Sequence, residues 1–243
     1  MVFIWMWWKR RKGEKVMLKG NSKYCYEDGT LINKFDIHDK TLLDNLTRDI
    51  TTYRIAQLNC GQNVIVDFFD VNSYLNLHKF LFSDVFYFAG EIRDEVIYKS
   101  NVPYYSDEYR KTSIFATPNN IISQLKNYFH QMKSRIHAIK SRDDLLDYLS
   151  YYYGEINVIH PFREGNGRTL RTYLKLLVDY LNQYFPSDME FQELDYSLWD
   201  SNDRDDLLKA TIICNVTGDC SLIRSCFDKV LVVKQERERL KRK

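Results

Sequence analysis

The centre of the chain carries a short segment whose residue types could bind and transfer a phosphate group: "HPFREGNGRTLR", from His160 to Arg171. Gly165 and Gly167 allow backbone angles that other residues avoid, so consecutive N–H groups can turn inward as an anion nest where the next helix begins. Arg168 and Arg171 are three residues apart, which places both guanidinium groups on one helical face near further phosphate oxygens. Cations at a helix N-terminus oppose the helix dipole, so a bound anion is the simpler explanation of their presence.

Two further side chains give this segment the groups for nucleotide chemistry. Glu164 supplies a hard oxygen beside the nest, suited to holding Mg²⁺ against a diphosphate. His160 lies four residues earlier and is the candidate general base, because an imidazole can titrate near neutral pH. With transition-state charge held by Asn166, the nest, the metal and the arginines, these groups indicate attack of a protein hydroxyl on a nucleotide phosphorus.

The segment resembles the motif of the Fic family, His-x-Phe-x-acid-Gly-Asn-Gly-Arg-x-x-Arg, and matches it at every specified position. Three flanking stretches also look like elements of bacterial Fic toxins and effectors: "YEDGTLINKFDIHD" (26–39), "FAGEIR" (88–93) and "ATIICNVTGDCSLI" (210–223). The resemblance implies an all-α fold with a short β-hairpin flap. It also implies an enzyme that transfers AMP from ATP to a Ser, Thr or Tyr hydroxyl of a target protein, with Mg²⁺ as cofactor.

The resemblance gives each matched position a role. His160 is the base that deprotonates the target hydroxyl, and Phe162 anchors the loop in the core. The positions that it implies for nucleotide and metal binding are Glu164 for Mg²⁺, Gly165, Asn166 and Gly167 for the anion hole, and Arg168 and Arg171 for the β- and γ-phosphates. The flap that would align the target segment by strand addition is placed at Val96, Ile97, Tyr98 and Lys99.

A regulatory feature of the family can be sought directly. Many Fic proteins are held inactive by a helix bearing Ser/Thr-x-x-x-Glu-Gly/Asn, whose Glu pairs with the second arginine of the motif, here Arg171. No Ser or Thr of this chain is followed by Glu four residues later. The resemblance therefore implies a toxin that is controlled by a small separate antitoxin carrying that helix. It implies a protein of the cytoplasm, with delivery as an effector as the other location.

Two other functions stay open on the same fold. One is transfer of another group, such as phosphate or UMP, through an altered nucleotide pose; the presence of both Gly165 and Gly167 favours nucleotidyl transfer over phosphorylation. The other is a non-catalytic regulator, against which the intact His160 and Glu164 argue.

Apolar residues recur at helical spacing in the segments that must position this site. The sequence predicts helices over 39–58, 72–89 with a stop at Gly90, 117–136, 141–156, 168–181, 207–213 and 222–233. Thr117-Pro118 is a predicted N-cap and N1 pair, and Ser141 with Asp144 a predicted capping box. Between 93 and 105 the period changes to two, which predicts the hairpin, with turn signals at Ser100-Asn101 and Pro103.

The composition is that of an ordinary folded domain, which excludes a disordered tail, a collagen and a repeat array. Lys and Arg number 35 against 33 Asp and Glu, and a net charge of +2 is too small to indicate a nucleic-acid or membrane partner. The apolar run Met1–Trp8 is too short to span a bilayer. We expect residues 1–23 to be a disordered leader, with Met17 as the hypothetical start, 24–232 to be one Fic domain, and 233–243 to be a charged tail.

The remaining cysteines and histidines give no metal pattern. Cys214, Cys220 and Cys226 lie at intervals of six, which on a continuous helix turns neighbouring thiols about 120° apart. We therefore predict free thiols and no shared metal. His130 and His137 are two helical turns apart, too far for one ion, and structural roles are the default for the isolated His38 and His78.

Overall fold

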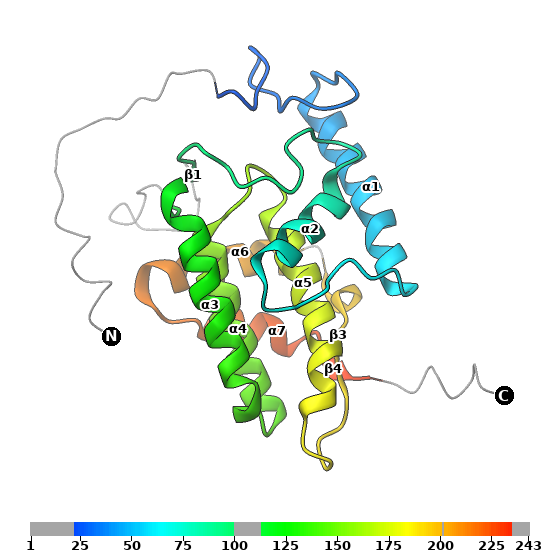
Figure 1. The fold of residues 1–243 in the computed structure, drawn as a ribbon, viewed down its shortest axis with the longest axis vertical. Coiled ribbons are helices and arrows are strands. Elements are labelled where there is room, and N and C mark those ends of the chain that lie inside the picture. Colours follow the sequence, from blue (N-terminus) through cyan, green and yellow to red (C-terminus); the bar gives the residue numbers. More distant parts are fainter. Residues whose placement is uncertain (1–21, 100–112, 201, 235–243) are drawn as a thin grey trace.

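The computed structural model describes residues 22–99, 113–200 and 202–234, and these are mostly helical (Figure 1). The helices are α1 (Lys40–Asn59), α2 (Val71–Phe82), α3 (Ile121–Arg135), α4 (Arg142–Ile159), α5 (Asn166–Leu181), α6 (Asp203–Thr217) and α7 (Ser221–Asp228). The strands are β1 (Tyr98–Lys99), β2 (Ser113–Ile114), β3 (Gln192–Leu194) and β4 (Leu231–Val233). Single turns of 3-10 helix lie at Pro118–Asn120, Ile136–Ala138, Asn182–Tyr184 and Tyr196–Leu198.

Helix α4 is the central element, because it packs against α3, α5, α6 and α7. The predicted capping box is confirmed at its start: the Ser141 hydroxyl accepts the Asp144 N–H at 3.1 Å and donates to the Asp144 carboxylate at 2.8 Å. Apolar side chains on α4 and α5, such as Leu149 and Leu174, are fully buried in one core. The all-α fold with a short hairpin is confirmed, and its core fixes the ends of α4 and α5 that carry the site.

The predicted helix over 72–89 is shorter than expected, since α2 ends at Phe82. The chain then turns, and Val85 and Phe86 both donate their N–H groups to the Phe82 carbonyl. Apolar residues on both sides of this turn are buried, which gives the sequence a helix-like pattern without a helix. Gly90 follows in the left-handed region (φ 85°) and ends the turn segment, not the helix.

Two small antiparallel sheets accompany the helices. In the hairpin, Tyr98 is opposite Ile114 and Lys99 opposite Ser113, so the return strand lies further along the chain than predicted. The predicted turn at 100–103 falls outside the described residues. The second sheet, β3 with β4, pairs Glu193 with Val232 and was not predicted. Helix α7 consequently ends at Asp228, and the helix predicted to continue to 233 is wrong because long-range pairing takes over its last residues.

Three residues that the sequence assigned to the terminal segments make side-chain contacts in the described structure. Ser22, placed in the leader by the sequence, hydrogen-bonds the Glu95 carboxylate at 2.8 Å, and Lys23 pairs with Asp94. At the other end, Lys234 pairs with Asp179 at 2.6 Å, although it was expected in the tail. Residues 1–21 and 235–243 lie outside the described residues.

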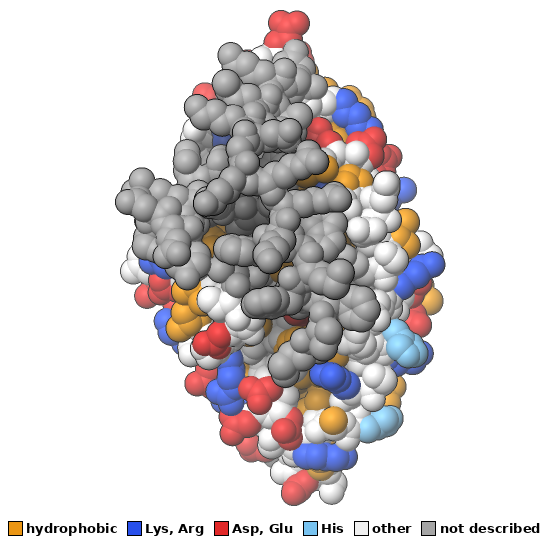
Figure 2. Space-filling view, turned by 90° about the vertical axis from the view of Figure 1, so that its left-hand side faces the viewer, with side chains coloured by type: hydrophobic (Ala, Val, Ile, Leu, Met, Phe, Trp, Pro, Cys, Tyr) orange, Lys and Arg blue, Asp and Glu red, His pale blue; other side chains and the backbone are white. Residues whose placement is uncertain are grey.

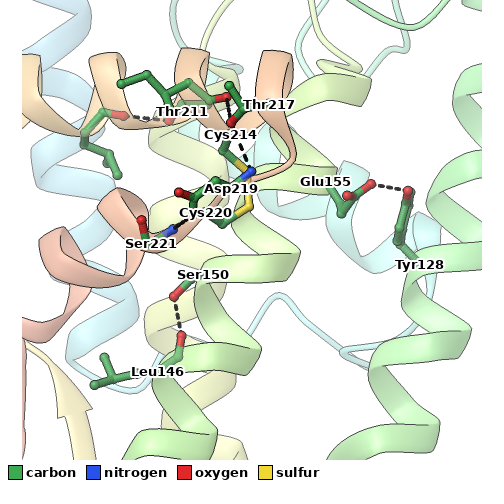
Figure 3. The surroundings of a disulfide bond; sticks show 12 residues. Tyr128, Leu146, Ser150, Glu155, Thr211, Cys214, Thr217, Asp219, Cys220 and Ser221 are labelled. Carbon is green, nitrogen blue, oxygen red and sulfur yellow. Dashed lines mark hydrogen bonds between the residues drawn. A yellow bond between two sulfur atoms is a disulfide. The ribbon is translucent and has the colours of Figure 1, made fainter. Parts of the chain in front are cut away.

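Cys214 and Cys220 are joined by a disulfide, so the prediction of free thiols is wrong for this pair (Figure 3). The prediction assumed one continuous helix, but α6 ends at Thr217 and Gly218 adopts the left-handed conformation that reverses the chain. The two Cα atoms thereby come within 4.6 Å. The disulfide packs on Gly154 of α4, where a Cβ atom would lie 2.6 Å from the Cys214 sulfur.

The described surface has no single-sign character on the face drawn in Figure 2, where Lys and Arg side chains are interspersed with Asp and Glu. This agrees with the small net charge. Among the helices of the described residues, none has the length and apolar content needed to cross a bilayer. The chemistry of the chain therefore has to be sought in a local site.

Candidate active site

The loop that joins α4 to α5 is held between two residues with positive φ. Helix α4 ends at Ile159, and His160 follows with φ 48°, an unusual value for a residue that carries a Cβ. Gly165 precedes α5 with φ 82°, and a Cβ there would lie 2.4 Å from the Phe82 ring. The loop thus needs glycine at position 165 both for its backbone angle and for its approach to α2.

The side chain of Asn166 closes this loop. Its Oδ1 accepts the Phe162 N–H at 2.8 Å, and its Nδ2 donates to the Phe162 carbonyl at 2.7 Å. Asn166 is 6% exposed, so both bonds are largely shielded from water. The amide is therefore committed to loop geometry, and any contribution of Asn166 to an anion hole has to come from its backbone. The N–H groups of a helix's first turn have no acceptor within the helix.

Phe162 is fully buried, as the sequence indicated, and His78 of α2 holds it in place. The two rings are stacked with centroids 3.7 Å apart. Gly90 donates its N–H to His78 Nδ1 at 2.8 Å, so this nitrogen carries no proton and Nε2 donates to the Glu164 carbonyl at 3.0 Å. Burial lowers the pKa of His78 to about 4, which keeps it neutral at physiological pH.

Arg93, the last residue of "FAGEIR", is a guanidinium only 1% exposed beneath the loop. It donates from Nε to the His160 carbonyl at 2.7 Å and from Nη2 to the Ile159 carbonyl at 3.2 Å. It also donates to the carbonyls of Glu95 at 2.7 Å and Ala116 at 2.6 Å, which flank the two hairpin strands. Burial lowers the pKa of Arg93, yet the four carbonyls and the C-terminal end of α4 favour its charge. The Arg93 side chain therefore connects the residues that flank the hairpin strands to the backbone of His160, the candidate general base.

The His160 ring is oriented by two neighbours. Nδ1 lies 3.1 Å from the Asn157 carbonyl, and because a carbonyl only accepts, Nδ1 is the protonated nitrogen. This tautomer leaves Nε2 as the nitrogen that can accept a proton. The ring stacks on Phe115, which follows β2, with centroids 3.9 Å apart.

His160 lines a cavity of about 310 Å³ together with the start of α5 and the inner face of α6. This volume is within the range of ligand pockets in proteins. Of the residues predicted for the site, those that line this cavity are His160, Glu164, Gly165, Asn166, Gly167, Arg168 and Arg171. The structure therefore brings the whole predicted loop to one cavity.

The arginines of the cavity differ in how they are held. Arg168 donates to the Thr51 hydroxyl of α1 at 3.2 Å, lies 3.4 Å from Glu164 and covers the Phe82 ring. Burial lowers the pKa of Arg168, and the nearby Glu164 opposes that shift. Arg171 lies beside Tyr153, whose pKa is raised by burial and lowered to a smaller degree by this guanidinium.

Glu164 fits a role as a single ligand of a divalent cation. Its carboxylate is 42% exposed, and the one described cation within ion-pair distance is Arg168, at 3.4 Å. Among the described residues there is no group of three or more acidic, His or Cys side chains that could form an all-protein metal site. Mg²⁺ commonly takes one or two carboxylates together with waters and phosphate oxygens, so one carboxylate beside a nucleotide is sufficient.

The predicted flap residues whose side chains are described, Val96 and Ile97, do not line this cavity. Val96 is 37% exposed, and neither it nor Ile97 is among the lining residues described. The side chains of Tyr98 and Lys99 lie outside what the structure describes. Phe115, on the opposite side of the hairpin, reaches the cavity instead.

Several cavity residues had no signal in the sequence. They come from α4, from the position after β2, and from α6: Asn157, Tyr153, Phe115, Arg204, Leu207, Leu208, Thr211, Ile212 and Asn215. Arg204 is the charged member of this set. Nothing in the local pattern of α6 distinguishes it from any exposed arginine, so sequence spacing alone could not have found it.

Comparison with known proteins agrees with this fold and site. Residues 68–178 match the model of the Fic/DOC family. The "Probable protein adenylyltransferase y4lH" of Sinorhizobium fredii is 32% identical over 158 residues, which are 64% of this chain and 74% of that protein. The chain belongs to the Fic/DOC family.

Two further similarities are to a longer bacterial protein and to a solved structure. The "Protein adenylyltransferase VbhT" of Bartonella schoenbuchensis is 30% identical over 76% of this chain, which spans only 34% of VbhT. The crystal structure of BepC from Bartonella tribocorum, a VirB-translocated effector with bound AMPPNP, superposes with a TM-score of 0.68. It is 18% identical and covers 87% of this chain and 97% of that one, which shows the same fold.

Proposed function

We propose that this chain is a protein adenylyltransferase, which transfers AMP from ATP to a Ser, Thr or Tyr hydroxyl of a target protein. The observation that carries the proposal is the His160 ring, which is oriented by Asn157 and lines one cavity with the first turn of α5. A base, an anion-binding backbone and two arginines in one cavity are the groups that nucleotidyl transfer requires. Relatives named as adenylyltransferases and a family structure holding AMPPNP support it.

The proposed step is a single displacement at the α-phosphorus. The target hydroxyl oxygen bonds to that phosphorus while its proton passes to His160 Nε2. The bond between the α-phosphorus and the bridging oxygen to the β-phosphate breaks, and pyrophosphate leaves. The first N–H groups of α5 and the side chains of Arg168 and Arg171 hold the phosphate charge during this change.

Mg²⁺ fits this proposal as a cofactor held by Glu164 together with phosphate oxygens of ATP. When bound, the cation supplies positive charge that offsets the charge of the departing pyrophosphate. The target segment would align against the hairpin at Val96, Ile97, Tyr98 and Lys99, because an exposed strand edge offers backbone partners to an extended peptide.

The regulatory part of the proposal is a toxin controlled by a separate small antitoxin. A glutamate presented by the antitoxin's Ser/Thr-x-x-x-Glu-Gly/Asn helix would pair with Arg171, the position that the γ-phosphate otherwise uses. Expression of the chain alone should then slow growth, and a His160→Ala chain should not. Normal growth with active wild-type chain present in the cell would contradict the toxin proposal.

The activity is tested by incubating the purified chain and a bacterial lysate with ATP labelled at the α- or the γ-phosphorus. Protein-bound label from the α position only is expected. His160→Ala should lose labelling while it still binds ATP, and His130→Ala, an exposed histidine of α3, is the matched control that should retain it. Label from the γ position would instead indicate phosphorylation, and no label with bound ATP would indicate a regulator.

A further inference from the structure

The cavity holds an arginine that the central loop does not supply. Arg204 lies in the first turn of α6, and it lines the same cavity as Arg168 and Arg171 of α5. It is exposed, so its side chain is available to a ligand and contributes little to the core. Helix α6 thus adds an arginine to a cavity that Arg163, Arg168 and Arg171 also line.

The charges of this cavity do not balance. Arg163 is paired with Glu95 at 2.9 Å, and Arg168 with Glu164 at 3.4 Å. Within the ranges that the structure describes, neither Arg171 nor Arg204 has a carboxylate at ion-pair distance. The described residues therefore provide no carboxylate partner for these two guanidinium groups in one partly enclosed space, a state that favours the binding of an anion.

The helices bring these cations together from distant parts of the chain. Although Arg204 is exposed overall, partial desolvation of its guanidinium lowers its pKa, and repulsion from Arg171 and from Arg48 of α1 lowers the pKa further. An arginine nevertheless keeps its charge at any physiological pH. Holding like charges together costs free energy unless a ligand carries the opposite charge, so a polyanion would stabilise this arrangement.

The direction of the cavity indicates which part of a nucleotide would reach Arg204. The proposed reaction places the α-phosphate beside His160 and the start of α5. Arg171 lies about one turn further along α5 than Arg168, so the remaining phosphates extend from Arg168 toward Arg171. Arg204 lines the same cavity and lies close enough to Arg171 for their charges to repel. The last phosphate of a triphosphate is the group that would lie between these two arginines.

We propose that Arg204 binds the terminal phosphate of a nucleoside triphosphate and makes the site prefer ATP to ADP. This inference rests on the proposed nucleotide site. The diphosphate lacks the group that Arg204 would contact, whereas both nucleotides share the base, the α-phosphate and the contacts of Arg168. Arg171 remains in place when Arg204 is substituted, so the change in discrimination between ATP and ADP on that substitution reports the contribution of Arg204.

The test is calorimetric titration of the full chain with ATP, ADP and inorganic pyrophosphate, each in the presence of Mg²⁺. Arg204→Ala should weaken ATP binding about tenfold or more, because a charge-assisted hydrogen bond is lost, and change ADP binding less than about twofold. The ATP affinity of Arg204→Lys should lie between those of the wild-type chain and Arg204→Ala, since lysine keeps the charge but lacks the planar guanidinium with its paired donors. Lys126→Ala, which removes an exposed cation of α3 away from the cavity, should change neither.

The outcomes separate this inference from the function on which it rests. ATP binding that Arg204→Ala leaves unchanged, or ATP and ADP binding weakened equally, would overturn the role of Arg204 while the nucleotide site stands. A wild-type chain that binds no nucleotide would overturn both. Weakened pyrophosphate binding in Arg204→Ala would support the inference, because the two phosphates of pyrophosphate correspond to the β- and γ-phosphates of ATP.

Discussion

His78 Nε2 donates a hydrogen bond to the backbone carbonyl of Glu164 at 3.0 Å, across 86 positions of sequence. The same imidazole accepts the Gly90 N–H and stacks on Phe162. One buried side chain of α2 therefore fixes both the anchor of the central loop and the backbone of its carboxylate residue. This arrangement, together with the contacts of Arg93, Gly165 and Asn166, makes loop geometry the main target of the predictions below.

Protonation of His78 should make the fold sensitive to acid. The unfolded imidazole titrates near 6.5 and the folded one near 4, so the unfolded state binds more protons between these values. The stabilising contribution is complete above pH 6.5 and falls as the pH drops toward 4, by about 3 kcal/mol in all. Urea unfolding at pH 5 and pH 7.5 measures it. His78→Gln, which cannot titrate, should show a smaller loss at pH 5; an equal loss in both proteins would contradict the assignment.

Gly165→Ala should damage both stability and nucleotide binding. The added Cβ would overlap the Phe82 ring, and alanine disfavours the positive φ of this position. Gly61→Ala is the matched control, because Gly61 also has positive φ (97°) but open space where a Cβ would lie. We expect a cost of about 1 kcal/mol for Gly61→Ala and of about 2 kcal/mol or more for Gly165→Ala. Denaturant unfolding of the two variants gives the comparison, and equal costs would argue against the overlap.

Arg93→Met should be strongly destabilising, because four carbonyls that are buried or partly buried would lose their donor. We expect a loss of about 3 kcal/mol or more in the free energy of unfolding. Arg142→Met removes a 40% exposed guanidinium that also contacts two carbonyls, and should cost about 1 kcal/mol or less. Thermal and urea denaturation of both variants test this, and a similar small cost for each would show that the Arg93 contacts contribute little.

Asn166→Asp should lower both the stability of the fold and its affinity for ATP. Aspartate keeps the acceptor for the Phe162 N–H but loses the donor to the Phe162 carbonyl, at a cost of about 1–3 kcal/mol. Asn182 makes the same pair of bonds with the backbone of Gln192, at 2.9 and 2.8 Å, outside the cavity. Asn182→Asp should therefore destabilise the fold by a similar amount without weakening ATP binding, whereas Asn166→Asp should do both. Calorimetric titration with ATP at a temperature where both variants are folded distinguishes them.

The sequence by itself determined the parts of this protein that depend on near neighbours. The spacing of Arg168 and Arg171 predicts that both guanidinium groups lie on one helical face, and the neighbouring His160 and Glu164 complete a candidate site within twelve residues of sequence. The cap at Ser141 and most helical segments were likewise predicted from residues only a few positions apart. The resemblance of the central motif to the Fic family implied the family and the all-α fold, and the comparisons and the structure confirm them.

Only the tertiary structure decided the contacts that join distant segments. His78, Arg93 and Arg204 are single residues that act next to segments far away in the sequence, so no spacing marks them. The disulfide depends on where α6 ends, and the β3–β4 pairing depends on segments nearly forty residues apart. Local patterns predict which residues of a short segment are buried or cap a helix. Contacts between polar groups of distant segments depend on how the helices pack. In this chain packing orients the loop and brings Arg204 of α6 to the cavity that the loop lines.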